Sequence, residues 1–180
     1  HYDLPLSKEK LCAWQSAFFP SGYSEGNQIE IGQYRTNEEH IVSGMFGREK
    51  IHYIAPSPDR VEEEMQKFLT WFDKDEPVSS VIRSVIAHFW FVSIHPFEDG
   101  NGRVGRLLMF KECLRHDVMP FIIDDKRRSR YLRGIKEWHT DRYDLVDVVM
   151  EAQDRFEAQI ELQRLYAHTR LYLPADYKED

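Results

Sequence analysis

The chain has 180 residues, of which 31 are acidic and 24 basic, so its formal net charge at pH 7 is −7. This balance argues against binding nucleic acid through overall charge, and the absence of an 18-residue apolar run argues against a membrane span. An apolar content of 42% is enough for one globular domain with a substantial core. The two cysteines, Cys12 and Cys113, are too few for a disulfide framework and are typical of a reducing compartment.

The first half of the chain predicts two helices. Ser7 is a suitable N-cap for a helix that continues to Phe18 and is ended by Pro20-Ser21-Gly22. Ser57-Pro58-Asp59 marks the start of the second helix, whose apolar stripe runs from Val61 to Phe72.

A β-hairpin is predicted between these helices. Ile29-Glu30-Ile31 alternates, and the apolar runs Ile41–Ser43 and Ile51–Ile54 flank a loop containing Gly44 and Gly47. Because an isolated hairpin is only marginally stable, it must lean on the helices.

The second half predicts mainly helices. The spacing of apolar residues predicts one over about 78–94, one from near Gly102, one over about 128–138 and a long one that carries Leu145 to Leu165. The basic cluster Lys126–Arg130 lies at a predicted helix start, where it either meets solvent or helps to collect an anionic nucleotide. We therefore expect a single all-α domain over residues 1–180, with a core of about 6–165 and a frayed tail at 171–180.

The stretch from His95 to Arg106 contains most of the side chains suited to catalysis and phosphate binding. It reads as a polar loop between two helices, and its glycines bring the backbone N–H groups of a helix N-terminus within reach of a phosphate. Arg103 and Arg106, three residues apart, form a pair of guanidinium forks suited to phosphate oxygens. Asp99 is a hard oxygen ligand of the kind that Mg²⁺ takes beside a nucleotide.

His95 is the group in this stretch whose ordinary pKa is close to neutrality, which makes it the natural general base. Together these residues indicate phosphoryl or nucleotidyl transfer. A second histidine, His88, lies seven residues earlier, but no third ligand is suitably spaced, so we interpret it as a buried structural residue rather than half of a metal pair.

At these residues the chain resembles the Fic family (filamentation induced by cAMP), whose signature is His-x-Phe-x-[Asp/Glu]-Gly-Asn-Gly-Arg-x-x-Arg. All eight specified positions are met, and similarity continues through Gly32–Arg35, Ile51–Pro56 and Met119–Ile123. The resemblance implies a Fic-type helical bundle with a small β-hairpin flap over the active site.

The resemblance also implies an activity: the transfer of AMP from ATP to a Ser, Thr or Tyr hydroxyl of a target protein, or of the chain itself, with release of pyrophosphate. Mg²⁺ is the implied cofactor and ATP the co-substrate. In related Doc-type enzymes a Lys replaces the glycine at position 102 and phosphorylation is favoured, so Gly102 favours adenylylation.

Each motif position receives a role by the same resemblance. His95 is the base, Asp99 the Mg²⁺ ligand and Phe97 an inward structural anchor. The phosphates are bound by an anion hole and two arginines: Gly100, Asn101, Gly102, Arg103 and Arg106. For the adenine we suggest the helix after the basic cluster, with Tyr131, Leu132 and Ile135, although a core role is equally consistent with these residues.

The family places its flap at the predicted hairpin. By resemblance, the backbone of Ile51, His52, Tyr53 and Ile54 pairs with an extended segment of the target protein and presents its hydroxyl to His95. Backbone pairing carries little sequence preference, so the identity of the target and its modified residue stay open. So does the oligomeric state. No nucleic-acid or membrane partner is expected.

Many relatives are inhibited by a helix with the pattern [Ser/Thr]-x-x-x-Glu-[Gly/Asn], whose Glu pairs with the second motif arginine, here Arg106. Ser21–Gly26 fits this pattern, but Pro20, Gly22 and Gly26 predict a turn, so we do not expect Glu25 to inhibit. The sequence begins with His1, and we expect the inhibitory helix upstream of it, on a separate antitoxin, or absent. The resemblance further suggests a bacterial, cytoplasmic protein.

Two other functional classes remain open. The same site could transfer another nucleotide, phosphocholine or phosphate, or remove AMP from a modified target. A non-catalytic helical binding module is disfavoured, because degenerate relatives usually lose the histidine or an arginine and this chain retains both arginines and His95.

Overall fold

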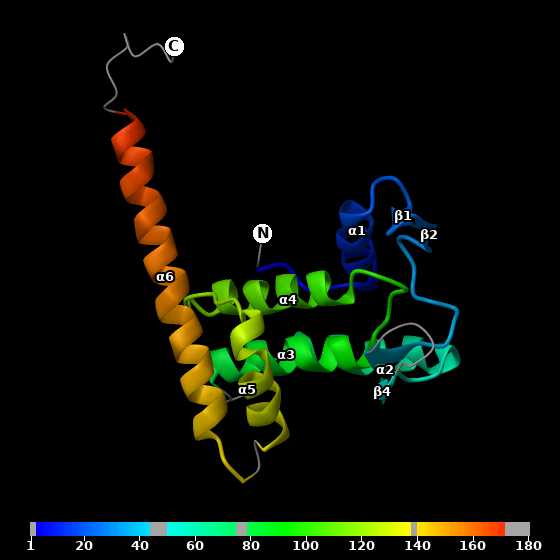
Figure 1. Cartoon of the computed structure of the whole chain (residues 1–180). Helices are drawn as coiled ribbons and strands as arrows, with labels where there is room; N and C mark the ends of the chain where they lie inside the picture. Colours follow the sequence, from blue (N-terminus) through cyan, green and yellow to red (C-terminus); the bar gives the residue numbers. More distant parts are fainter. Residues whose placement is uncertain (1–2, 44–49, 75–78, 138–139, 172–180) are drawn as a thin grey trace. The chain divides into compact units, whose positions relative to one another are not determined.

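The computed structural model describes residues 3–43, 50–74, 79–137 and 140–171 (Figure 1). Contacts within the chain divide it into two compact units, His1–His116 and Asp117–Asp180, and each is described by itself. The described parts contain these helices and strands: α1 (Lys8–Phe18), β1 (Tyr23–Ser24), β2 (Asn27–Gln28), β3 (His40–Ser43), β4 (Lys50–Ile54), α2 (Pro58–Phe72), α3 (Ser80–Ile94), α4 (Asn101–Arg115), α5 (Asp125–Lys136) and α6 (Tyr143–Leu171).

The predicted helix starts of the first unit are confirmed. The Ser7 hydroxyl accepts the backbone N–H of Lys10 at 3.3 Å and caps α1, and Pro58 occupies the first turn of α2. Helix α3 ends at Ile94 and α4 begins at Asn101, so the His95–Gly100 loop separates two helices as predicted.

The core of the first unit lies where α2, α3 and α4 meet. Phe68 of α2 is fully buried, and its ring centroid lies 5.7 Å from that of Trp90 and 5.9 Å from that of Phe91, both on α3. Helices α3 and α4 run side by side (Figure 1). Side chains of α3 pack directly on the α4 backbone at Gly105, where an added Cβ would come within 2.8 Å of His88 Cδ2. This close packing fixes the two ends of the intervening loop.

Two small antiparallel hairpins complete the unit. The predicted β3–β4 hairpin is confirmed, with His40 opposite Ile54, Ser43 opposite Lys50 and a bulge between Ile41 and Val42. The loop residues 44–49 lie outside the described residues.

The alternating Ile29–Ile31 segment, part of the hairpin signal in the sequence, does not form a strand. The second hairpin instead pairs Tyr23 with Gln28 and Ser24 with Asn27. The Ile29 N–H donates to the Gly22 carbonyl at 3.0 Å, and beyond it the backbone bonds to side chains: the N–H of Glu30 donates to the Glu98 carboxylate at 2.8 Å, and that of Gly32 donates to Gln15 Oε1 at 2.8 Å. This segment is therefore tied to the His95–Gly100 loop and to α1.

The second unit is built from α5 and α6. Asp124, not the basic cluster, caps α5 by accepting the Arg127 N–H at 3.1 Å, so the helix begins three residues earlier than predicted. Helices α5 and α6 approach closely at Gly134, where a Cβ would lie 2.8 Å from the Leu145 backbone nitrogen.

The interpretation of the basic cluster as solvated or nucleotide-collecting is not supported for two of its arginines. Arg127 pairs with Asp124 at 2.8 Å and with Glu151 at 3.3 Å, and Arg130 pairs with Glu151 at 2.9 Å and with Asp144 at 3.3 Å. These two arginines thus join α5 to the acidic face of α6, while Lys126 and Arg128 are exposed.

The buried residues of α6 lie in its first half, and residues 161–166 are exposed. Leu145, Val148, Val149 and Ala152 are buried, whereas Met150, predicted on the apolar stripe, is 57% exposed. Residues 172–180, predicted to be frayed, lie outside the described residues. Among the helices that are described, none combines the length and apolar character that crossing a membrane requires.

Candidate active site

The loop between α3 and α4 is shaped by two left-handed residues. His95 directly follows α3 with φ 52° and ψ 58°, and Gly100 directly precedes α4 with φ 88°. The left-handed region is unfavourable for a residue with a Cβ, so His95 must be held there by its surroundings. A Cβ at position 100 would also meet the Phe19 ring at 2.8 Å, so this position requires glycine.

The buried Arg35 holds the backbone at His95. Its Nε donates to the His95 carbonyl at 2.7 Å, and its own backbone N–H donates to the Pro96 carbonyl at 2.8 Å. The guanidinium also donates to the carbonyls of Asn37 at 2.7 Å and Pro56 at 2.6 Å, which flank β3 and β4. Arg35 therefore connects the α3–α4 loop to the base of the hairpin.

The imidazole of His95 is oriented as a base requires. Nδ1 lies 3.2 Å from the Val92 carbonyl oxygen. Because a carbonyl only accepts, Nδ1 must carry the hydrogen, which leaves the lone pair of the neutral ring on Nε2. Burial lowers the pKa of His95 below its ordinary value, and Arg35 acts in the same direction, while the Val92 carbonyl and Asp99 oppose them. The neutral form is thus favoured near pH 7.

Asn101 shapes the loop from inside. It is 2% exposed, and its amide makes two hydrogen bonds to Phe97: Oδ1 accepts the Phe97 N–H at 2.9 Å and Nδ2 donates to the Phe97 carbonyl at 2.6 Å. Phe97 is fully buried, with its ring centroid 5.7 Å from that of Tyr34 and 6.1 Å from that of Phe91. The Asn101 side chain is therefore occupied by the loop, and only its backbone N–H is left to serve an anion hole.

Replacing Asn101 by Leu should disorder this loop. The substitution leaves the Phe97 N–H and carbonyl buried without their partners, at a cost of about 2–4 kcal/mol of unfolding free energy. Chemical denaturation of both proteins measures this loss. Asn37→Leu is the matched control, because Arg35 bonds to the Asn37 backbone carbonyl, which the substitution retains. A loss of equal size in that variant would contradict the role assigned to the Asn101 amide.

The N-terminus of α4 faces the loop with backbone donors. The first N–H groups of a helix have no acceptor within the helix, and the Gly100 cap offers no side chain to bond them. Arg106 folds back to this end: its Nη1 lies 3.6 Å from the position of a Cβ on Gly102. Arg103 stacks on Phe19, with Cζ 4.4 Å from the ring centroid, and its Nη2 is 4.0 Å from Asp99 Oδ2. Two cations and a helix N-terminus thus converge on one place, an arrangement that fits a phosphate chain.

Asp99 offers a half-exposed carboxylate beside these cations. Its Oδ2 accepts the Ser24 hydroxyl, and its backbone carbonyl accepts Gln15 Nε2 at 3.4 Å. Among the described residues no group of three or more His, Cys, Asp and Glu side chains gathers as a metal site. A lone carboxylate at a phosphate site nevertheless suits Mg²⁺, which binds through one or two carboxylates and the phosphates themselves.

The remaining predicted site residues fall in two places. Tyr53 and Ile54 of β4 are 42% and 60% exposed, while the side chains of Ile51 and His52 lie outside the described residues. Tyr131, Leu132 and Ile135 lie on α5 of the second unit, and Tyr131 is 4% exposed whereas Leu132 is 46% exposed. Their suggested role around the adenine stays a prediction.

His88 is half-buried rather than fully buried as predicted, and Glu25 lies in the predicted turn. His88 packs against Gly105 of α4, and burial, followed by the nearby Arg106, lowers its pKa to about 4. Glu25 lies in the turn of the β1–β2 hairpin with φ 48° and is exposed, so the predicted turn is confirmed.

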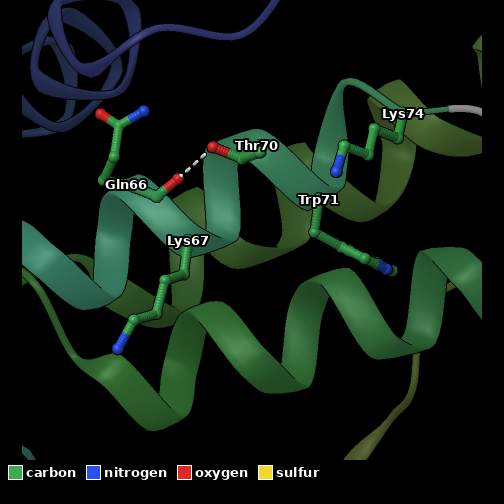
Figure 2. Close-up of a pocket in the computed structure, with 5 residues that line it drawn as sticks. All are labelled: Gln66, Lys67, Thr70, Trp71 and Lys74. Atoms are coloured by element: carbon green, nitrogen blue, oxygen red, sulfur yellow. Dashed lines mark hydrogen bonds between the residues drawn. The ribbon is translucent and has the colours of Figure 1, made fainter.

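A hollow of about 320 Å³ lies apart from the motif (Figure 2). Its lining comes from α2 and from Lys74 just beyond it: Gln66, Lys67, Thr70, Trp71 and Lys74. Lys67 is paired with Glu63 at 2.7 Å and with Glu64 at 3.0 Å. None of the lining residues belongs to the His95–Arg106 stretch, so this hollow is separate from the candidate active site.

Sequence reasoning missed two side chains that position the site, Gln15 and Arg35. Gln15 is fully buried, and it joins α1 to the Asp99 carbonyl and to the Gly32 N–H. A detectable signal was its position four residues after Leu11, on the apolar face of the first helix, where a polar residue needs a partner. Arg35 gave no signal of its own apart from its place in the Gly32–Arg35 similarity.

Comparison with known proteins agrees with this fold and loop. A sequence model of the Fic/DOC family matches residues 5–113, so the chain belongs to the Fic/DOC family. The chain is similar to the protein adenylyltransferase Fic of Drosophila melanogaster, 35% identical over 112 residues, which cover 60% of this chain and 20% of that protein. It is also similar to that of Drosophila virilis, 34% identical over 110 residues, which cover 60% and 21% of the two chains. The chain thus spans about a fifth of the length of these curated relatives.

Solved structures share the fold. A Fic family protein from Desulfovibrio desulfuricans G20 superposes with a TM-score of 0.61 at 26% identity, covering 87% of this chain and 48% of that one. A Fic domain containing signaling protein from Bacteroides thetaiotaomicron superposes with a TM-score of 0.65 at 19% identity, covering 86% and 60%. The prediction of a Fic-type helical fold with a small hairpin is confirmed.

Proposed function

We propose that this chain is a protein adenylyltransferase, which transfers AMP from ATP to a hydroxyl side chain of a protein. The observation that carries the proposal is the convergence at the start of α4 of a half-buried His95 whose neutral form is favoured, the Asp99 carboxylate and the guanidinium groups of Arg103 and Arg106. The curated relatives named protein adenylyltransferase support the same reaction.

In the proposed reaction His95 Nε2 takes the proton of the attacking Ser, Thr or Tyr hydroxyl. The hydroxyl oxygen forms a bond to the α-phosphorus of ATP, the bond from that phosphorus to the bridging oxygen breaks, and pyrophosphate leaves. The backbone N–H groups of the α4 N-terminus bind phosphate oxygens, and Arg103 and Arg106 neutralise charge on the β- and γ-phosphates. The absence of a side chain at Gly102 leaves space beside Arg106 for the phosphates.

Asp99 is the residue proposed to hold Mg²⁺. When bound, the ion neutralises phosphate charge and aligns the leaving group. The Ser24 hydroxyl, which already donates to Asp99, fixes one carboxylate oxygen in place. The Gly100 N–H donates to the other oxygen, so the carboxylate is held on both sides and the arginines are the groups that adjust to the nucleotide.

The β3–β4 hairpin is proposed to receive the target. A two-stranded sheet leaves outer strand edges, and β4, which contains the exposed Tyr53 and Ile54, is suited to pairing with an extended segment. Self-modification is the form of the reaction that needs no identified target.

A bacterial origin and a cytoplasmic location stay predictions, and the two curated relatives are fruit-fly proteins.

Parallel incubations with α-labelled and γ-labelled ATP in the presence of Mg²⁺ test the proposal. Adenylylation predicts that label reaches protein from α-labelled ATP alone and that intact mass rises by one AMP. Label from γ-labelled ATP alone would show phosphorylation and overturn the proposal. Substituting labelled GTP, UTP and CTP measures nucleotide preference, and transfer from one of these in place of ATP would assign a different nucleotidyl transfer to the site.

A further inference from the structure

The hydrogen bonds of Arg35 extend beyond the motif that identifies the family. The side chain is 2% exposed, and its guanidinium reaches two regions that are far apart in sequence: the end of α3 and the two ends of the β3–β4 hairpin. Nε donates to the His95 carbonyl at 2.7 Å, and Nη2 lies 3.5 Å from the Ile94 carbonyl. On the hairpin side, Nη1 donates to Asn37 and Nη2 to Pro56.

Arg35 contacts the backbone of His95, whose left-handed conformation is unfavourable. A left-handed residue with a Cβ costs about 1–2 kcal/mol and persists only when its neighbours enforce it. The carbonyls of Ile94 and His95 are at the C-terminal end of α3, where helical carbonyls lack intrahelical partners and a cation is favourable. Arg35 meets both needs with a planar fork that a lysine cannot reproduce.

We propose that Arg35 is a positioning residue that ties the two ends of the β3–β4 hairpin to the His95 backbone. One side chain then positions both the hairpin and the imidazole of His95. The role in transfer rests on the proposed function; the coupling of hairpin and His95 does not. Target docking on the hairpin and the orientation of His95 Nε2 are therefore coupled, because both depend on the same guanidinium.

The charges around this contact come from three segments. Arg35 and Asp99 act in opposite directions on His95, and Glu39, which precedes β3, interacts with Arg35, Glu98, Asp99 and His40. Arg35 is the buried cation of this group. A lysine at position 35 keeps the charge but loses the fork, which separates the geometric part of the role from the electrostatic part.

The test compares Arg35→Lys and Arg35→Gln with Arg83→Lys. Arg83 is an equally buried arginine on α3 that also donates to backbone carbonyls, those of Trp71 and Phe72, which lie at the end of α2 rather than at His95 or the hairpin. All proteins are first measured for thermal midpoint and assayed well below it. The readouts are the histidine ring signals in NMR spectra of histidine-labelled protein, with His95 assigned from a His95→Ala spectrum, and the self-adenylylation rate with its KM for ATP.

We expect Arg35→Lys to shift the His95 ring signals and to lower the self-adenylylation rate at saturating ATP by about tenfold to a hundredfold, as a small misplacement of a reacting group does. The KM for ATP should change little, since Arg35 is not in the phosphate site. Arg83→Lys should lose stability but keep the His95 signals and the rate. Arg35→Gln, which loses the charge as well as the fork, should lower the rate at least as much as Arg35→Lys.

Two results would overturn the proposal. One is an unmoved His95 ring signal in a folded Arg35 variant. The other is that neither Arg35 variant folds while Arg83→Lys does, which would make Arg35 a residue of the fold alone. If the wild-type chain transfers no AMP, the proposed function fails, and the NMR comparison still decides whether Arg35 positions His95.

Discussion

Replacing His95 by Ala is expected to lower self-adenylylation by a factor of about 10²–10⁴, the range that a positioned general base contributes. The substitution removes Nε2, the group that accepts the hydroxyl proton, but leaves the helix N-terminus and both arginines that bind the nucleotide. ATP affinity, measured by titration calorimetry with Mg²⁺, should therefore be nearly unchanged. His116→Gln, at the other end of α4, is the control and should keep the full rate.

The pH dependence of the wild-type rate should follow the protonation of His95. His95 acts only when neutral, and burial and Arg35 lower its pKa below the ordinary histidine value. The rate should then be constant around pH 7 and should fall on acidification only below the ordinary pKa of about 6.5. A rate that begins to fall above this value would mean that His95 is stabilised as the cation, contrary to its surroundings in the structure.

Removing the carboxylate of Glu112 is expected to be the most destabilising single change outside the site. Glu112 is fully buried on α4, and its carboxylate pairs with Arg83 of α3, which is 1% exposed. Glu112→Leu leaves a buried cation without its partner, at a cost of about 3–5 kcal/mol of unfolding free energy. Denaturant unfolding of wild type and variant measures this loss.

The double variant Arg83→Met, Glu112→Leu is the control for this prediction. Replacing both charges by apolar groups removes the uncompensated ion, so most of the stability should return. A double variant as unstable as Glu112→Leu alone would show that the pair matters for packing rather than for charge. The pair also joins α3 to α4, the two helices that hold the ends of the loop.

Local signals in the sequence were sufficient for most elements. The Ser7 cap and the Pro58 start depend on neighbouring residues only, which is why α1 and α2 begin where predicted. The start of α5 was misplaced because Asp124 was overlooked as its cap. The prediction for Ile29–Ile31 was wrong for another reason: the Glu30 N–H donates to the Glu98 carboxylate and the Glu30 carbonyl accepts from Gln15, and these side chains, distant in sequence, override the local alternation.

The sequence by itself determined the family and the set of reacting groups, because the spacing from His95 to Arg106 places a base, a carboxylate and two cations around one helix start. Only the tertiary structure decided how that loop is held. The left-handed His95, the Asn101 amide turned inward on Phe97 and the Arg35 guanidinium shared by hairpin and loop all depend on contacts between segments. Such contacts leave no periodic pattern in the chain, since a buried polar side chain is specified by its partner and not by its neighbours.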